Sequence, residues 1–379
     1  MRTVNAALAV LSITLTAAAH AAPAAQHWYR CNTHTHTASF PNSDANVSAE
    51  YAAQWYKRHG YQCLVITDHE HLTPVEPLNQ ELGGEGTFLV ISGQEVTQGL
   101  APAVPGGAFR WAHVNGINTD KVIYPVGFPK ELPPQMLLGD AYRKYAPTDR
   151  SPAQAYISNI DAIYEAGGIP QVNHPTGRWG VRLEELKKIS RPFLFEVWNA
   201  FPSIGPLGGV DEGGGQVPSF EALWDGLLSE GKTVWGVASD DTHDYLNFDD
   251  PTAPTPGHAW IVVQAPSLTL TSILDALRRG HFYASTGITL AEYRADRKEI
   301  SITLSKPLAW KATTQREDVL FTTRFIGSGG RVLAQVTGLA PHYTVKGDEG
   351  YVRAAVTDSD GRRAWTQPVF LDDRPNAIP

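Results

Sequence analysis

Short apolar runs alternate with longer amphipathic segments over the first two thirds of the chain. Runs such as 61–67 and 233–238 are apolar and rich in β-branched residues, which is typical of buried strands. Residues 151–165 predict a helix, because a Ser-Pro pair opens it and a glycine follows its end. Strands that alternate with helices predict parallel βαβ units. About seven units over roughly 260 residues fit a closed or distorted TIM-like α/β barrel better than a single nucleotide-binding sheet.

The pattern changes after Ser285. Shorter strand-like runs follow one another there, separated by Gly, Pro and Asp turns instead of helices. This pattern predicts a small all-β, sandwich-like C-terminal domain of roughly 90 residues. We therefore expect a barrel domain over residues 26–285 and a second domain over residues 286–379. The predicted C-terminal strands are 299–305, 317–325, 331–336, 350–356 and 364–371.

The first residues have the pattern of a targeting segment. Arg2 supplies a positive charge, residues 6–18 form an apolar run, and Ala19-His20-Ala21 has the small residues of a cleavage site. We expect residues 1–21 to be a bacterial signal peptide and the mature protein to be periplasmic or secreted; a buried N-terminal helix is the alternative. No later run approaches the ~18–20 apolar residues of a membrane span, so no membrane association is expected after cleavage.

Charge and cysteine content narrow the class of function. Removal of Arg2 reduces the 31 Lys and Arg to 30, against 39 Asp and Glu, which is a net charge of −9. This charge argues against a nucleic-acid-binding surface.

Export would permit a disulfide between Cys31 and Cys63, and a buried free pair is equally compatible with the sequence. No paired-cysteine zinc motif occurs, so metal ligands must be nitrogen and oxygen atoms.

Histidine and carboxylate residues follow the predicted strands. His34 and His36 come after a short aromatic strand, and residues i and i+2 of a strand point to the same side. Asp241 and His243 repeat this spacing near the end of the barrel segment. The carboxyl ends of parallel barrel strands meet on one face, so residues far apart in sequence are expected to share one pocket. In chain order these strand-end residues are His34, His36, Asp68, His69, Glu95, His113, His174, Glu196, Asp241 and His243.

The type and number of these side chains indicate a metal cluster. Imidazole and carboxylate ligands without thiolates suit Zn, Mn or Fe better than Cu(I) or an iron–sulfur cluster. One tetrahedral ion cannot use so many ligands, so we expect two or three divalent ions. Glu95 or Asp241 could bridge them. Buried polar residues with ordinary hydrogen bonds are the alternative at each position.

The order of the motifs resembles the polymerase-and-histidinol-phosphatase (PHP) superfamily of metal-dependent phosphoesterases. His-x-His, Asp-His, Glu, His, His-Pro and Asp-x-His follow one another over residues 28–287. Residues 196–199 (Glu-Val-Trp-Asn) and 238–243 (Ala-Ser-Asp-Asp-Thr-His) look most similar to its carbaryl-hydrolase-like branch. The resemblance implies a distorted (β/α)7 barrel with a di- or trinuclear site. Matched by position, the implied metal ligands are His34, His36, Asp44, His69, Glu95, His113, His174, Asp241 and His243.

The expected activity is hydrolysis of a phosphoester in a small, anionic substrate. Metal ions at these ligands would lower the pKa of a bound water to near neutrality, and the resulting hydroxide would attack phosphorus in line. Asp241 is assigned to the site rather than Asp240, because only Asp241 completes an Asp-x-His motif. Besides Asp241 and Glu95, we assign catalytic roles to His71, which shares strand parity with the Asp-His histidine, and to Arg178, which could hold an anionic group.

Two alternatives stay open for the function. The same hydroxide could attack a carbonyl carbon, which would make the protein an amide, carbamate or carboxylic ester hydrolase. The other alternative is a non-catalytic periplasmic metal- or ligand-binding protein. Metal-storage proteins tend to carry His-rich tracts, whereas these ligands occur singly on separate strands. The irregular, Pro-rich stretch 119–150 is longer than a routine connection and is expected to cover the site or contribute to it.

Overall fold

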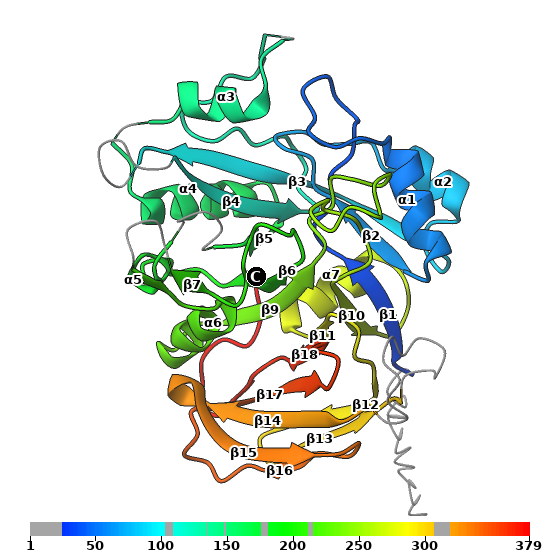
Figure 1. Ribbon diagram of the computed structural model, residues 1–379, viewed down its shortest axis with the longest axis vertical. Helices are drawn as coiled ribbons and strands as arrows, with labels where there is room; N and C mark the ends of the chain where they lie inside the picture. Colours follow the sequence, from blue (N-terminus) through cyan, green and yellow to red (C-terminus); the bar gives the residue numbers. More distant parts are fainter. Residues whose placement is uncertain are drawn as a thin grey trace, which may run out of the picture.

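The computed structural model shows a mixed α/β fold that consists mostly of β-sheet, with few helices (Figure 1). It describes residues 25–102, 109–133, 135–147, 149–175, 181–210, 215–306 and 319–379. The predicted signal peptide, residues 1–21, lies outside this part. The helices are α1 (Ala49–Arg58), α2 (Glu76–Leu82), α3 (Leu138–Lys144), α4 (Pro152–Glu165), α5 (Leu183–Leu186), α6 (Phe220–Ser229) and α7 (Leu270–Arg279).

One sheet of 14 strands passes through the described chain. Its first half has the strand order β10-β1-β2-β3-β4-β5-β6-β9. The small β7–β8 hairpin lies outside this sheet. The described strands up to Ser285 are β1 (His27–Asn32), β2 (Cys63–Ile66), β3 (Leu89–Leu100), β4 (Arg110–Ile117), β5 (Ile169–Val172), β6 (Phe193–Asn199), β7 (Gly209–Val210), β8 (Gln216–Val217), β9 (Val234–Ser239), β10 (Trp260–Ala265) and β11 (Phe282–Ser285).

The ring of strands that the sequence predicted as a barrel is not closed in the described residues. Strand β9 pairs with β6, and no described ladder joins β9 to β1 or β10. Instead β1 pairs antiparallel with β10, and β10 with β11, so the sheet continues toward the C-terminal strands. The alternation of strands and helices specifies local units, whereas closure depends on pairing between distant strands. The fold is therefore an open, mixed sheet and not the closed barrel that the sequence predicted.

The strand directions also differ from the predicted parallel units. Strands β1, β2 and β3 are parallel, as are β5, β6 and β9, but β4 runs antiparallel to both β3 and β5. The connection between β3 and β4, residues 101–109, is too short for the dozen or more residues of a parallel crossover. An antiparallel pair needs no such crossover. As a result Glu95 lies within a long strand instead of at its end.

Local sequence signals explain where the main helices begin. The structure confirms the helix predicted over residues 151–165, and Ser151 and Gln154 form a reciprocal capping box at its start. Helix α1 begins at Ala49, because the side chain of Ser48 accepts the backbone N–H of Tyr51 in its first turn. Asn46 donates to Asp244 and so fastens the loop after His243.

The chain after Ser285 forms a β-rich region that continues the long sheet. Strand β18 pairs with β11, so the sheet crosses the predicted domain boundary without interruption. A separate sheet of β12, β13 and β16 shares an apolar cluster with β14 and β17. The division into two domains stays a prediction. The strands of this region are β12 (Leu290–Ala295), β13 (Glu299–Leu304), β14 (Phe321–Gly327), β15 (Arg331–Thr337), β16 (His342–Thr344), β17 (Tyr351–Asp358), β18 (Arg363–Thr366) and β19 (Val369–Phe370).

The two cysteines form a disulfide between neighbouring parallel strands. Cys31 of β1 is in register with Cys63 of β2, and their Cα atoms are 4.5 Å apart. Both side chains are buried in the main apolar core. The disulfide therefore fixes the strand that leads directly into the His34-x-His36 segment. No helix in the described part of the chain is long and apolar enough to cross a membrane.

Candidate metal centre

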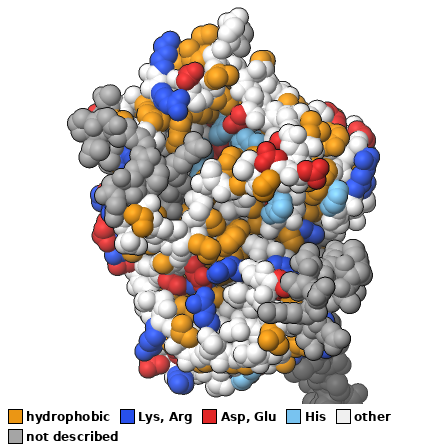
Figure 2. Space-filling view, viewed as in Figure 1, with side chains coloured by type: hydrophobic (Ala, Val, Ile, Leu, Met, Phe, Trp, Pro, Cys, Tyr) orange, Lys and Arg blue, Asp and Glu red, His pale blue; other side chains and the backbone are white. Residues whose placement is uncertain are grey.

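The nine residues predicted as metal ligands converge in one cluster. They come from the ends of β1, β2, β5 and β9, from the middle of β3 and β4, and from the loop before α1. Most of them border a cavity of about 240 Å³. Figure 2 shows histidine side chains in a hollow with acidic and hydrophobic side chains beside it. The described residues that line the cavity are Asp44, His69, Glu95, Trp111, His113, His174, Phe201, Ser203, Ile204, Asp241 and His243.

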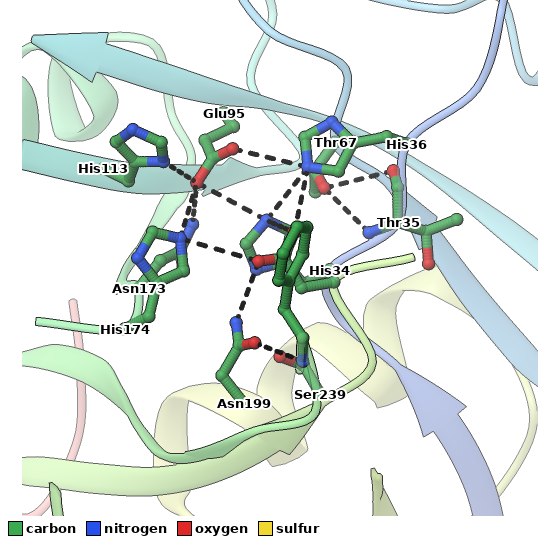
Figure 3. A network of polar contacts seen from close by, with 12 residues as sticks. His34, Thr35, His36, Thr67, Glu95, His113, Asn173, His174, Asn199 and Ser239 are labelled. Carbon is green, nitrogen blue, oxygen red and sulfur yellow. Dashed lines mark hydrogen bonds and ion pairs between the residues drawn. The ribbon is translucent and has the colours of Figure 1, made fainter. Parts of the chain in front are cut away.

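The central group consists of His34, His36, Glu95 and Asp241. The Nε2 atoms of the two histidines are 3.1 Å apart, and Asp241 Oδ1 lies 3.1 Å from one and 3.3 Å from the other. Carboxylate oxygens of Glu95 lie 3.4 Å from each Nε2 (Figure 3). A tetrahedral ion bound at about 2.0–2.1 Å holds its ligand atoms about 3.3–3.4 Å apart. The two histidine nitrogens therefore lie at the spacing of ligands on one ion, both from each other and from each carboxylate.

A second group lies nearer to solvent and contains Asp44, His69 and His243. Asp44 Oδ2 is 3.5 Å from His69 Nε2 and 3.5 Å from His243 Nε2. The ring of His243 also stacks on His36, with the centroids 4.1 Å apart. The Asp44 side chain is 45% exposed, whereas the His69 side chain is only 6% exposed. Asp44 therefore completes this group from the solvent side.

A third group contains Glu95, His113 and His174 (Figure 3). His113 Nδ1 lies 2.8 Å from Glu95 Oε1, and His174 Nε2 lies 3.6 Å from the same oxygen. His113 Nε2 is buried and has no hydrogen-bond partner in the described part of the chain. A buried nitrogen without a partner is unfavourable. A bound ligand on this side of the cluster would satisfy it.

Glu95 connects the three groups. Its Oε1 atom faces His113 and His174, and its Oε2 atom lies 3.4 Å from both His36 Nε2 and His69 Nδ1. Asn173 donates its side-chain N–H to Oε1 at 2.7 Å. The carboxylate is almost fully buried. Glu95 thus contacts all three groups, and its role as a bridging ligand stays a prediction.

A buried carboxylate, Glu196, orients the His34 ring of the central group. It accepts a hydrogen bond from His34 Nδ1 at 2.8 Å, which directs Nε2 of this ring into the cluster. The backbone N–H of His174 and the side chains of Ser239 and Asn199 also donate to Glu196. Asn199 reaches Asp241 Oδ2 as well, at 3.1 Å. The sequence placed Glu196 near the site, but it gave no signal that the amide of Asn199 or the hydroxyl of Ser239 takes part.

The structure distinguishes the two adjacent aspartates. Asp240 points away from the cluster, because its carboxylate accepts from Asn32, Tyr56 and three successive backbone N–H groups at residues 257–259. Asp241 has φ 53°, a conformation that L-residues rarely adopt, and this turn aims its carboxylate at His34 and His36. The structure thus places Asp241 in the site, and Asp240 holds the base of the following loop.

The sequence also predicted three further residues near the site. Asp68 accepts from the hydroxyls of Thr37 and Thr73, so it supports the segment that carries His36. His71 stacks on Phe40 with the centroids 5.0 Å apart and is not among the described residues of the cavity, so its catalytic role stays a prediction. Arg178 lies outside the described residues.

Buried carboxylates and imidazoles control one another's ionisation. Burial alone would lower the pKa of His36, but hydrogen bonds to Asp241 and Glu95 raise it to about 10. Burial likewise opposes ionisation of Asp241 and Glu95, yet the neighbouring histidines lower the pKa of both carboxyl groups. His113 differs, because burial lowers its pKa to about 4. The cluster therefore favours positive charge at its centre, which protons or metal ions can supply.

Comparison with known proteins gives structural similarities only. No protein-family model matches the sequence, and no curated protein matches it either. One similar solved structure is a two-domain protein from Bacteroides vulgatus that contains a predicted PHP-like metal-dependent phosphoesterase. It is 14% identical, the alignment covers 90% of this chain and 95% of that one, and the TM-score is 0.41. Another, from Bifidobacterium adolescentis, carries a tentative description as a metal-dependent phosphoesterase. It is 15% identical, with coverage of 60% and 90% and a TM-score of 0.37.

Proposed function

We propose that the protein is a metal-dependent hydrolase of the PHP type that cleaves phosphoesters on a cluster of two or three divalent ions. The observation that carries this proposal is the set of 3.1–3.4 Å distances from the Nε2 atoms of His34 and His36 to each other and to carboxylate oxygens of Asp241 and Glu95. One ion would bind His34, His36, Glu95 and Asp241. The groups around Asp44 and around His113 would hold the others, with Glu95 shared. Imidazole and carboxylate donors favour Zn, Mn or Fe.

The side chains around the cluster prepare it for hydrolysis. Divalent ions bound there would lower the pKa of a water molecule and polarise the bond to be cleaved. Glu196 fixes the ring orientation of His34, and Asn173 and Asn199 fix the carboxylates of Glu95 and Asp241. All three contacts keep the donor atoms in place before the ions bind, which lowers the cost of assembling the site.

The walls of the cavity would receive the rest of the substrate. Trp111, Phe201 and Ile204 give one side of the cavity an apolar surface, and Ser203 adds a hydroxyl. The described lining contains no Lys or Arg, so the ions would balance the charge of an anionic group. The same observation favours a second candidate function, hydrolysis of a neutral amide, carbamate or ester, which needs no basic residue beside the metals.

Export to the periplasm or the medium is part of the proposal. The disulfide between Cys31 and Cys63 supports it, because such bonds persist mainly in oxidising compartments. Mass spectrometry of the exported chain tests whether the N-terminal segment has been removed. We expect cleavage near Ala21.

Metal analysis of the purified mature protein, combined with paired assays, tests the proposed function. The substrates are an aryl phosphodiester, an aryl phosphomonoester, an aryl ester and an aryl carbamate. We expect two or more equivalents of metal and phosphoester turnover that Asp241→Ala abolishes. Turnover of only the carbonyl substrates would favour the second candidate. A protein without stoichiometric metal would contradict both and leave a binding function.

A further inference from the structure

The stretch before α4 lies against the second group of the cluster. We call residues 119–133 and 135–145 the α3 arm, since this stretch contains helix α3. Gln94 of β3 holds its first part by accepting the backbone N–H of Ile123 at 2.7 Å. Helix α3 approaches β3 so closely that a Cβ atom at Gly99 would collide with the backbone carbonyl of Tyr142. The arm is therefore fitted to the strand that carries Glu95 and Thr97 (Figure 1).

A series of buried contacts connects the arm to a predicted metal ligand. Tyr142 of α3 donates its hydroxyl to Glu70 Oε2, and Glu70 Oε1 accepts the backbone N–H of Thr97 at 2.6 Å. Thr97 Oγ1 in turn lies 2.8 Å from His69 Nδ1. This last contact leaves His69 Nε2 to face Asp44. All of these side chains except that of Asp44 are buried, so a displacement of Tyr142 is transmitted to His69.

The backbone at Glu70 is strained, and the contacts of its side chain compensate for the strain. Glu70 has φ 44°, a conformation that favours glycine and is unfavourable for a long side chain. Its two hydrogen bonds to Thr97 and Tyr142 offset this cost. The contact with the α3 arm therefore helps to stabilise the strained conformation of Glu70.

A second contact connects the arm to the loop that carries Asp44. Asn42 donates its side-chain N–H to the carbonyl of Met136 at 2.8 Å. Asn42 lies two residues before Asp44. The arm thus supports two ligands of the same group, Asp44 and His69. The central group is held from another direction, by Glu196 and Asn199.

We propose that the α3 arm sets the affinity of the metal position formed by Asp44, His69 and His243, with Tyr142 and Glu70 as positioning residues. The inference rests on the proposed function. This group includes Asp44, whose side chain is 45% exposed, a larger fraction than for any of the other predicted ligands. It is the group most open to solvent, so its ion is the one that exchanges first.

Metal retention in matched variants tests this proposal. The mature protein is stripped of metal, reloaded with Zn²⁺, dialysed against a weak competing chelator and analysed for zinc equivalents and thermal unfolding. Tyr142→Phe removes only the hydroxyl that reaches Glu70. The control is Tyr164→Phe, which removes a hydroxyl that donates to the carbonyl of Pro192 away from the cluster. His243→Ala gives the reference for the loss of this position alone.

We expect Tyr142→Phe to lose one zinc equivalent, like His243→Ala, with an affinity about 10–100-fold lower at that position and the other equivalents retained. Tyr164→Phe keeps every equivalent. Asn42→Ala weakens the same single equivalent without any change in the core.

Other results would overturn the inference. Full retention of zinc in both Tyr142→Phe and Asn42→Ala would mean that the arm does not control this position. Loss of all equivalents together with a lower unfolding temperature would show that Tyr142 is merely structural. Fewer than two equivalents in the wild-type protein would refute the proposed function itself, and this result is obtained before any variant is compared.

Discussion

Two of the buried carboxylate clusters in the described part of the chain differ in the source of their positive charge. Between α6 and β17, Arg353 donates to both oxygens of Asp225, at 2.8 and 2.7 Å, and to Glu221 at 3.0 Å. The guanidinium group is fully buried and lies 4.7 Å from the ring centroid of Trp224. The chain itself therefore neutralises this interface cluster, which joins the first part of the fold to the C-terminal strands.

The metal centre has comparable carboxylates but no such internal cation. Its described groups contain only His, Asp and Glu, and its described lining contains no Lys or Arg. Buried charges without partners are costly, so the carboxylates must take positive charge from histidine protons or from ions. The difference indicates that the interface cluster is structural, whereas the metal centre is built to bind.

Metal removal should give the largest effect. Treatment with a strong chelator should decrease hydrolysis at least about 10³-fold, because several kcal/mol of charge stabilisation are lost. The interface cluster contains its own cation, so the chain should stay folded. Steady-state assays and circular dichroism before and after chelation check this, with activity restored by Zn²⁺ or Mn²⁺. Full activity in a protein shown to be metal-free would contradict the proposed chemistry.

The interface cluster should respond to loss of its own cation. Arg353→Met leaves Asp225 and Glu221 buried without a partner and should decrease the free energy of unfolding by about 3–5 kcal/mol. Zinc content per folded molecule should not change. Arg324→Met is the matched control, since Arg324 is 38% exposed and contacts Glu221 at 3.8 Å; it should cost less than about 1 kcal/mol. Equal effects in urea unfolding would argue against the distinction between these arginines.

The convergence of the predicted ligands could be anticipated because its signal is local. The i, i+2 spacing places His34 and His36 on one side of an extended segment. Asp241 and His243 have the same spacing, but there the left-handed backbone at Asp241 sets the direction of its side chain. Position at a strand end then brings distant segments together. The choice of Asp241 over Asp240 followed from the same spacing, and the hydrogen bonds of Asp240 explain it physically.

The remaining features depend on contacts between distant segments, which spacing does not reveal. The antiparallel β4 and the open ring result from strand pairing across the sheet. Asn199 and Ser239 are ordinary residues near strand ends, and only the fold brings them to Glu196. The short connection before β4 was visible in the sequence and could have indicated the antiparallel pair.

Weakening a support of the metal centre should have an intermediate effect. Glu196→Gln retains the size of the side chain, but the NH₂ end of an amide cannot accept a hydrogen bond. Either the pair His34 Nδ1 and Ser239, or the N–H of His174, would therefore lose its acceptor. Metal affinity or kcat/KM should decrease about 10–100-fold. Glu184→Gln, at an exposed pair with Lys187, should have no effect. An unchanged zinc affinity in Glu196→Gln would mean that His34 is oriented by other contacts.

The smallest effect concerns acid stability of the interface cluster. Burial alone would raise the pKa of Glu221, but Arg353 and Arg324 lower it below its ordinary value. A carboxyl group with a lowered pKa stabilises the fold above its unfolded pKa of about 4.3, and this contribution is lost as the pH falls through the folded pKa.

Glu221→Gln should therefore be less stable than the wild type at pH 7, by about 1–2 kcal/mol for a charged hydrogen bond, and the difference should shrink below about pH 4. Urea unfolding of both proteins at pH 7 and below about pH 4 measures this difference. Chelator is present throughout, so metal loss makes no contribution. Glu230→Gln, which alters a half-exposed pair with Lys187, should show almost no difference at either pH. A Glu221→Gln difference that stays constant in acid would mean that the side chain stabilises the interface by packing and not by charge.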